Sequence, residues 1–146
     1  MKYDTATPYL AVYILFRRDN KLAFVLRKST AWMDNYYALP AGKVDHDESV
    51  LQAAVREAKE EVGIDIAPEN LKHLLTVYRR SDLLFIDILF EAQNWQGELY
   101  NAEPEKHSKL DWLDTNNLPD NVIPATKFYL DQIKAGHTYA EYGWPS

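Results

Sequence analysis

Apolar and polar residues alternate along this chain with two different periods, and each period predicts one kind of element. The segments 8–18 (PYLAVYILFRR) and 21–28 (KLAFVLRK) are rich in β-branched and aromatic residues, and only an Asp-Asn pair separates them. They predict two strands joined by a tight turn. The segments 71–80 and 83–92 predict a second strand pair around a Ser-Asp turn, and a short strand is expected near 109–113.

From about Ser49 to Val62 the apolar period becomes helical, and Gly63 is well placed to end this helix in a left-handed cap. A second helix is expected over 126–136. Strands, a central helix, more strands and a terminal helix together predict an α/β or α+β sandwich with a mixed sheet. The apolar stripe of the central helix consists of Leu51, Ala54, Val55, Ala58 and Val62.

The composition is that of one globular domain, which we expect to span residues 1–146. The net charge of −6 and the lack of a basic run argue against a duplex nucleic acid as partner. The absence of cysteine excludes disulfides and thiolate metal sites. The N-terminus does not resemble a signal peptide and no segment has the length of a membrane span, so we expect a cytoplasmic protein without a membrane partner.

Three glutamates, Glu57, Glu60 and Glu61, share one face of the central helix, close to its C-terminal end. Like charges at this spacing cost about 0.2–0.5 kcal/mol per pair, and the helix dipole disfavours acids at this end. A bound hard divalent cation, Mg²⁺ or Mn²⁺, would reverse both penalties. The alternative is an acidic, solvated face without chemistry.

The residues before these glutamates decide between the two interpretations. Gly42 is followed after five residues by Glu48, and after seven more by the run REAKEEVGI (56–64). This pattern resembles the signature of the Nudix hydrolases at every fixed position, with Ala58 where a larger aliphatic residue is commoner. The resemblance implies an α/β Nudix fold, an α/β/α sandwich with a mixed sheet and a loop–helix–loop catalytic box.

The resemblance also implies a metal-dependent hydrolase of a phosphoanhydride bond in a nucleotide. Arg56 would orient the glutamates. Glu48 would do structural work in the loop or support the metal ligands, and the alternative is a first-turn acid that the helix dipole favours. The general base would be Glu57 or Glu61 within the box, or Glu103 in the loop after the W-x-G-E run, where the alternative is an ordinary exposed acid. The implied ligands of Mg²⁺ (or Mn²⁺) are the carbonyl of Ala41 and the carboxylates of Glu57, Glu60 and Glu61.

The chain looks most like the MutT branch, which hydrolyses a nucleoside triphosphate to a nucleoside monophosphate and pyrophosphate. Arg27 matches a phosphate-contacting arginine of that branch and Asn121 an asparagine that reads the purine. As alternatives, Arg27 is a strand-end residue and Asn121 a turn residue. The small-molecule nucleotide substrate would include oxidised or non-standard triphosphates.

Two rival functions remain open: a nucleoside diphosphate sugar or ADP-ribose pyrophosphatase, and a domain that binds a nucleotide without cleaving it. The oligomeric state, monomer or homodimer, is open too. Three aromatic residues near the C-terminus would cover the core, join a dimer interface or line the pocket: Tyr139, Tyr142 and Trp144.

Overall fold

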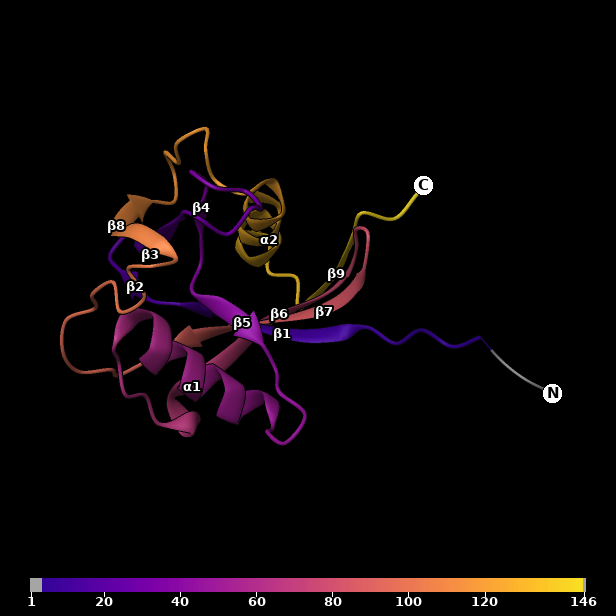
Figure 1. Ribbon diagram of the computed structural model, residues 1–146, viewed down its shortest axis with the longest axis horizontal. Helices are drawn as coiled ribbons and strands as arrows, with labels where there is room; N and C mark the ends of the chain where they lie inside the picture. The colour runs from indigo at the N-terminus through magenta and orange to yellow at the C-terminus, as the bar shows by residue number, and fades with distance from the viewer. Residues whose placement is uncertain (1–3, 146) are drawn as a thin grey trace.

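The computed structural model describes residues 4–145 and contains two sheets and two α-helices (Figure 1). The larger sheet is mixed, with strand order β5-β1-β7-β6-β9. Its β1–β7 and β6–β9 pairs are parallel, whereas β1–β5 and β6–β7 are antiparallel. Its strands are β1 (Tyr9–Leu15), β5 (Ala41–Lys43), β6 (Leu71–Arg80), β7 (Leu84–Ala92) and β9 (Tyr139–Tyr142).

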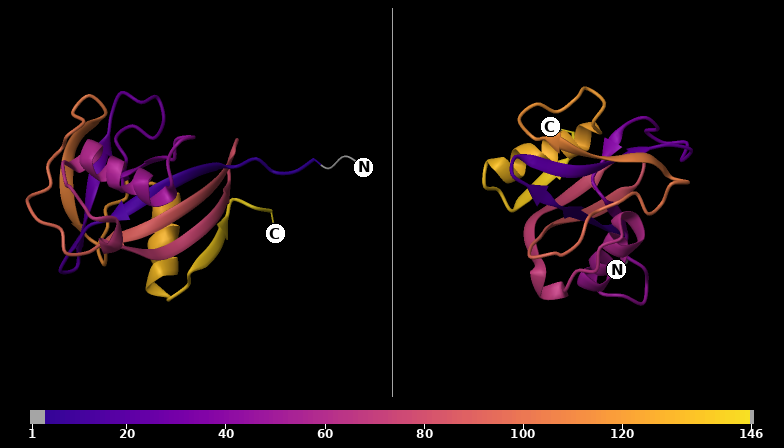
Figure 2. Two further views of the ribbon diagram at one scale, coloured as in Figure 1. Left: turned by 90° about the horizontal axis from the view of Figure 1, so that it is seen from below. Right: turned by 90° about the vertical axis from the view of Figure 1, so that its left-hand side faces the viewer.

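The smaller sheet is antiparallel and is centred on β3, which pairs with β2, β4 and β8. In the left-hand view of Figure 2, residues 4–8 extend away from the body toward the same side as the segment after β9. No helix within residues 4–145 is long and apolar enough to cross a membrane. The strands of this sheet are β2 (Arg17–Arg18), β3 (Lys21–Arg27), β4 (Tyr37–Ala38) and β8 (His107–Asp114).

The two helices, α1 (Val50–Val62) and α2 (Pro124–Lys134), lie on opposite faces of the larger sheet (Figure 1). Alternate residues of β1 show this arrangement, because Val12 and Ile14 join the α1 core while Leu15 joins the α2 core. A strand covered on both faces is apolar nearly throughout, as the sequence of β1 is. The predicted α/β sandwich with a mixed sheet is confirmed.

The first predicted strand pair is wrong in its pairing. The segment 8–18 is not one strand: β1 ends at Leu15, and after Phe16 the chain enters the smaller sheet as β2. Only the short β2 pairs with β3. Phe16, the residue between the two strands, is fully buried in the α1 core, and this burial fixes the point at which the chain leaves one sheet for the other. The pair β6–β7, by contrast, forms the expected hairpin.

The helix ends follow local sequence signals. Ser49 caps α1 with its side chain and forms a capping box with Gln52, and Gly63 ends the helix at φ 73°. Helix α2 begins two residues earlier than expected, because Pro124 suits the first helical turn. A short 3₁₀ turn, η1 (Pro68–Asn70), leads into β6.

The aromatic residues near the C-terminus cover the sheet edge. Residues Tyr139–Tyr142 add β9 in parallel to β6. Trp144 then packs on Tyr78 with ring centroids 4.9 Å apart, and its indole N–H donates to the Tyr78 carbonyl at 3.0 Å. Strand β9 was not predicted, because its four residues carry no strand pattern without the edge that they complete.

Candidate active site

Helix α1 holds two of its three glutamates in buried positions beside the β5 strand. Glu57 and Glu61 are 8% and 7% exposed, whereas the Glu60 side chain is 50% exposed. Gly42 makes the approach of Glu57 possible, since a Cβ at this position would overlap the Glu57 carboxylate. The backbone N–H of Ala41 points to Glu61 Oε2 at 3.4 Å. Strand β5 and the second half of helix α1 therefore meet at one place.

Arg56 organises the acidic face. Its guanidinium binds both carboxylate oxygens of Glu48, at 3.0 Å from Nε and 2.6 Å from Nη2. Its Nη1 donates to Glu57 at 2.9 Å and to Glu60 at 3.1 Å. Nη2 also donates to the Lys43 carbonyl at 3.0 Å. One planar group thus ties the loop to the helix and fixes the orientation of the Glu57 and Glu60 carboxylates.

A second cluster of potential ligands joins Glu61 to the loop before β8. One ligand atom each of Glu61, Glu103 and His107 lies within 4.8 Å of the others. Nδ1 of His107 is buried and has no hydrogen-bond partner among the residues that the structure describes. Lys106 Nζ lies 3.3 Å from the Glu103 carboxylate. Glu103 therefore lies beside the box, and its role as the general base stays a prediction.

Burial shifts the titration of this cluster. Burial raises the pKa of Glu57 to about 7 against the opposing charge of Arg56. Burial, followed by the charges of Glu57 and Glu103, raises the pKa of Glu61 well above its usual range. Burial, followed by the charge of Arg27, lowers the pKa of His107 to about 4. Two carboxylates that resist ionisation and one neutral imidazole are a set that a divalent cation would stabilise.

One cavity of about 460 Å³ adjoins this cluster. Ala41 and Glu61 line it from the box, and Arg27 and His107 line it from the smaller sheet. Further lining comes from β6, from the turn after it and from α2. The cavity therefore lies between the two sheets and opens onto the acidic cluster.

The two predicted substrate residues are placed differently. Arg27 lines the cavity, where its guanidinium donates to the Trp32 carbonyl at 3.0 Å and lies 5.0 Å from the centre of the indole. Asn121 donates its amide N–H to the Asn35 carbonyl at 2.9 Å and is not among the residues of the described chain that line the cavity. The role of Asn121 as a reader of the base stays a prediction.

Sequence reasoning missed His107, although it follows Glu103 by four residues and is the first residue of β8. It also missed Asp87, the one charge within the apolar run 83–90, and its partner Arg79. A charge in such a strand is a signal of a buried ion pair, but the partner is visible only once β6 and β7 are paired.

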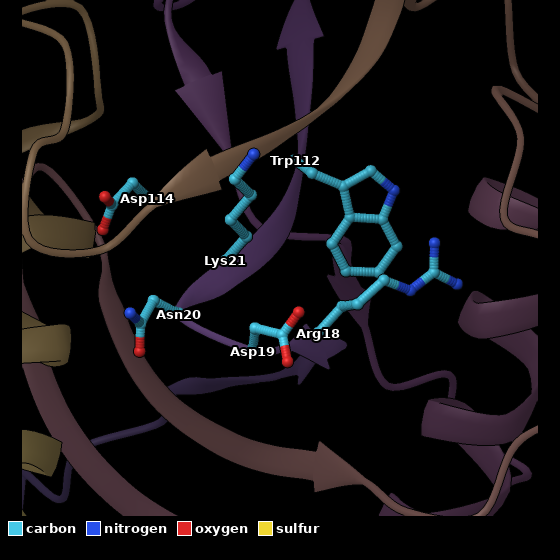
Figure 3. A pocket seen from close by; sticks show the side chains of 6 residues that line it. All are labelled: Arg18, Asp19, Asn20, Lys21, Trp112 and Asp114. Atoms are coloured by element: carbon cyan, nitrogen blue, oxygen red, sulfur yellow. The ribbon is translucent and has the colours of Figure 1, made fainter.

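A second hollow shares no lining residue with the cavity beside the box. It has a volume of about 400 Å³ and is lined by residues of the β2–β3 turn and of β8 (Figure 3). The guanidinium of Arg18 lies 4.6 Å from the ring centre of Trp112 there and pairs with Glu98 at 3.5 Å. This hollow holds none of the predicted site residues.

A comparison of the sequence with models of protein families identifies the family to which this site belongs. The model of the NUDIX domain matches residues 7–133. The chain belongs to the Nudix family. The match confirms the family predicted from the spacing of Gly42, Glu48 and Arg56-Glu57, and with it the enzyme class, a Nudix hydrolase of nucleotide phosphoanhydrides.

Relatives of this Nudix chain include proteins with different substrates. An ADP-ribose pyrophosphatase of Methanocaldococcus jannaschii is 34% identical over 87% of this chain and 74% of its own. An 8-oxo-dGTP diphosphatase of Escherichia coli is 30% identical over 86% and 95% of the two chains. The crystal structure of a MutT NUDIX hydrolase from Burkholderia pseudomallei superposes with a TM-score of 0.78, at 29% identity over 86% and 98%. The predicted MutT-like character is thereby confirmed.

Proposed function

We propose that this Nudix hydrolase cleaves nucleoside triphosphates, oxidised or non-standard ones included, to a nucleoside monophosphate and pyrophosphate. The observation that carries the proposal is that Arg27 lines the same cavity as Ala41 and Glu61 of the box. A guanidinium at this place binds phosphate oxygens. The volume of about 460 Å³ suits one nucleotide.

The residues of the box fit a divalent cation. The carbonyl of Ala41 and the carboxylates of Glu57, Glu60 and Glu61 supply the oxygen ligands that Mg²⁺ or Mn²⁺ prefers. A bound cation would neutralise phosphate charge and lower the pKa of a water molecule. The protein itself orients the ligands through Arg56 and excludes bulk water by burying Glu57 and Glu61.

Glu103 is the proposed proton acceptor for the attacking water. It lies next to Glu61, and its side chain is 17% exposed at the edge of the cluster. The ammonium of Lys106 lies 3.3 Å from the Glu103 carboxylate, and this ion pair helps to hold the carboxylate at the edge of the cluster. Arg27 binds the phosphates from the opposite wall of the cavity. The attacking water and the scissile bond therefore lie between the carboxylate of Glu103 and the guanidinium of Arg27.

His107 is expected to influence which cation the site prefers. A buried imidazole nitrogen within reach of Glu61 and Glu103 adds a ligand that Co²⁺ accepts readily and Mg²⁺ does not. Replacing His107 with Phe is therefore expected to weaken Co²⁺ binding by about tenfold and to change Mg²⁺ binding little. Calorimetric titration of the metal-free protein with each cation measures this ratio. Equal losses for both cations would show that the imidazole only fills space.

A second candidate substrate is ADP-ribose, which is favoured by the 34% identical relative named ADP-ribose pyrophosphatase. A substrate panel with Mg²⁺ or Mn²⁺, read by product identity, separates the two. Triphosphates are expected to yield a nucleoside monophosphate and pyrophosphate, and to exceed ADP-ribose in kcat/KM by about tenfold or more. Higher kcat/KM for ADP-ribose, with AMP and ribose phosphate as products, would overturn the proposal. Tight nucleotide binding without turnover would favour a binding domain.

A further inference from the structure

A buried ion pair forms part of the cavity wall and has no role in the chemistry described above. Arg79 of β6 donates from Nε to Asp87 Oδ2 at 2.6 Å and from Nη2 to Asp87 Oδ1 at 3.3 Å. Asp87 lies in the middle of β7 with no exposed surface, and it also accepts a hydrogen bond from the hydroxyl of Tyr129 in α2. Arg79 itself lines the cavity. The carboxylate is therefore fully engaged, while the side chain of Arg79, 15% exposed, lines the cavity.

Strand register places this ion pair at a defined separation from the glutamate box. Tyr13 of β1 pairs with Ala41 on one side and with Leu89 on the other. Asp87 precedes Leu89 by two residues, so it lies two strand spacings and two residues away from Ala41. With ordinary strand spacings this separation is about 12 Å. A nucleotide with its phosphates at Ala41 and Glu61 can place its base near Arg79.

The charge of the pair favours a neutral group over a further phosphate. Asp87 cancels the charge of Arg79, so little net attraction remains for an anion. Arg79 binds Asp87 through Nε and through one N–H of Nη2, and its Nη1 makes no hydrogen bond to Asp87. Phe85 covers the guanidinium face at 4.0 Å from its ring centre. The remaining edge thus offers N–H donors in one plane, which suits the edge of a base.

The rest of the wall is aromatic, as a base-binding surface requires. Tyr13, Phe85, Tyr129 and Tyr142 line the same cavity as Arg79. Tyr129 and Tyr142 pack with ring centroids 6.3 Å apart, and Tyr13 meets Tyr129 edge-on at 5.9 Å. Aromatic rings packed edge-on in this way form a rigid apolar wall. The donors of Arg79 are therefore held in a fixed direction.

We propose that Arg79, held by Asp87, is the specificity-determining residue of this hydrolase and binds a base with two adjacent hydrogen-bond acceptors. Guanine offers N7 and O6 on its major-groove edge, and cytosine offers N3 and O2 on its pairing edge. Adenine and thymine carry no such pair of adjacent acceptors on these edges. The proposal rests on the proposed function, in that it assumes the cleaved substrate to be a nucleotide.

The test compares the wild-type protein with Arg79→Lys on dGTP, dCTP, dATP and dTTP. Lys keeps the charge opposite Asp87 but lacks the planar pair of donors. The wild type is expected to prefer dGTP or dCTP, and the variant to lose about tenfold or more in kcat/KM for the preferred base, through KM. The kcat/KM values for dATP and dTTP should change little. An equal loss on all four substrates, or a wild type without base preference, would overturn the proposal.

Two further arms make the result specific. The analogue 7-deaza-dGTP lacks N7, so a loss with it identifies the guanine edge, and an unchanged rate with dGTP preferred contradicts binding through N7. Arg17→Lys is the matched control, because Arg17 pairs with Glu91 at 3.6 Å on the surface and is expected to leave all four rates unchanged. Thermal unfolding verifies that Arg79→Lys is folded, and Asp87→Asn, which releases the guanidinium, is expected to reduce the same preference.

Failure of the proposed function would be visible separately. Binding of the four nucleotides can be measured by calorimetry with Ca²⁺ in place of the catalytic cation, and this reads base preference without turnover. Preference in binding that Arg79→Lys removes, together with absent triphosphate cleavage, would refute the proposed reaction and retain the role of Arg79. Triphosphate cleavage without base preference would retain the reaction and refute the role of Arg79.

Discussion

Replacing Glu61 with Gln is expected to reduce metal-dependent turnover by at least about 100-fold and, at the same time, to make the metal-free protein more stable. Glu61 is the residue at which the box and the loop before β8 meet, since it lies within 4.8 Å of potential ligand atoms of Glu103 and His107. An amide has the same shape but no charge, so it binds a hard cation weakly. Steady-state kinetics at saturating Mg²⁺ or Mn²⁺ measures the loss.

The gain in stability follows from the direction of the pKa shift. The folded protein holds the Glu61 proton more tightly than the unfolded chain, because burial and the nearby charges of Glu57 and Glu103 raise its pKa. The unfolding free energy therefore decreases as the pH rises above the ordinary carboxyl range. Gln has no proton to lose, so at pH 8 without metal the variant is expected to gain about 1 kcal/mol, or roughly 2–4 °C in Tm.

The matched control is Glu98→Gln, because the Glu98 side chain is 82% exposed and only pairs loosely with Arg18. We expect no change in Tm or turnover for this variant. Added Mg²⁺ should raise the Tm of the wild type more than that of Glu61→Gln, since only the wild type binds the ion well. Undiminished activity of Glu61→Gln, or a lower Tm at pH 8, would contradict the role assigned to Glu61.

The box was predictable from sequence because its geometry is local. The helix from Ser49 to Gly63 is fixed by a capping box, an apolar stripe and a left-handed glycine, all of which depend on neighbours within a few turns. The same local spacing brings Arg56 to Glu60 and Glu57. Its contacts with Glu48 and Lys43, which lie outside the helix, agree with the supporting role considered for Glu48.

The parts that sequence did not predict depend on contacts between distant segments. Strand β9 forms only because β6 offers an open edge more than fifty residues earlier in the chain. His107 joins Glu61 because β8 pairs with β3 in the smaller sheet, next to the helix. The Arg79–Asp87 pair requires the register of the β6–β7 hairpin and the approach of Tyr129 from α2. No local pattern carries these pairings.

Replacing Arg56 with Lys is expected to lower kcat by about 10- to 100-fold while the protein remains folded. The guanidinium holds three carboxylates and one carbonyl at the same time, at distances between 2.6 and 3.1 Å. A lysine ammonium carries the same charge but has three donors at one point, so it cannot span Glu48 and Glu57 together. The expected loss in kcat therefore comes from the lost orientation of the carboxylates, because the charge is kept.

Metal binding separates these two effects. If Arg56 acts by orienting Glu57 and Glu60, the Lys variant should bind Mg²⁺ more weakly in calorimetry, and saturating metal should restore only part of the turnover. Lys59→Arg in the same helix is the matched control, because Lys59 pairs with the exposed Asp65 at 3.1 Å and is expected to leave both quantities unchanged. Full activity of Arg56→Lys would mean that charge alone suffices, and that the planar set of contacts around Arg56 contributes only to the stability of the loop.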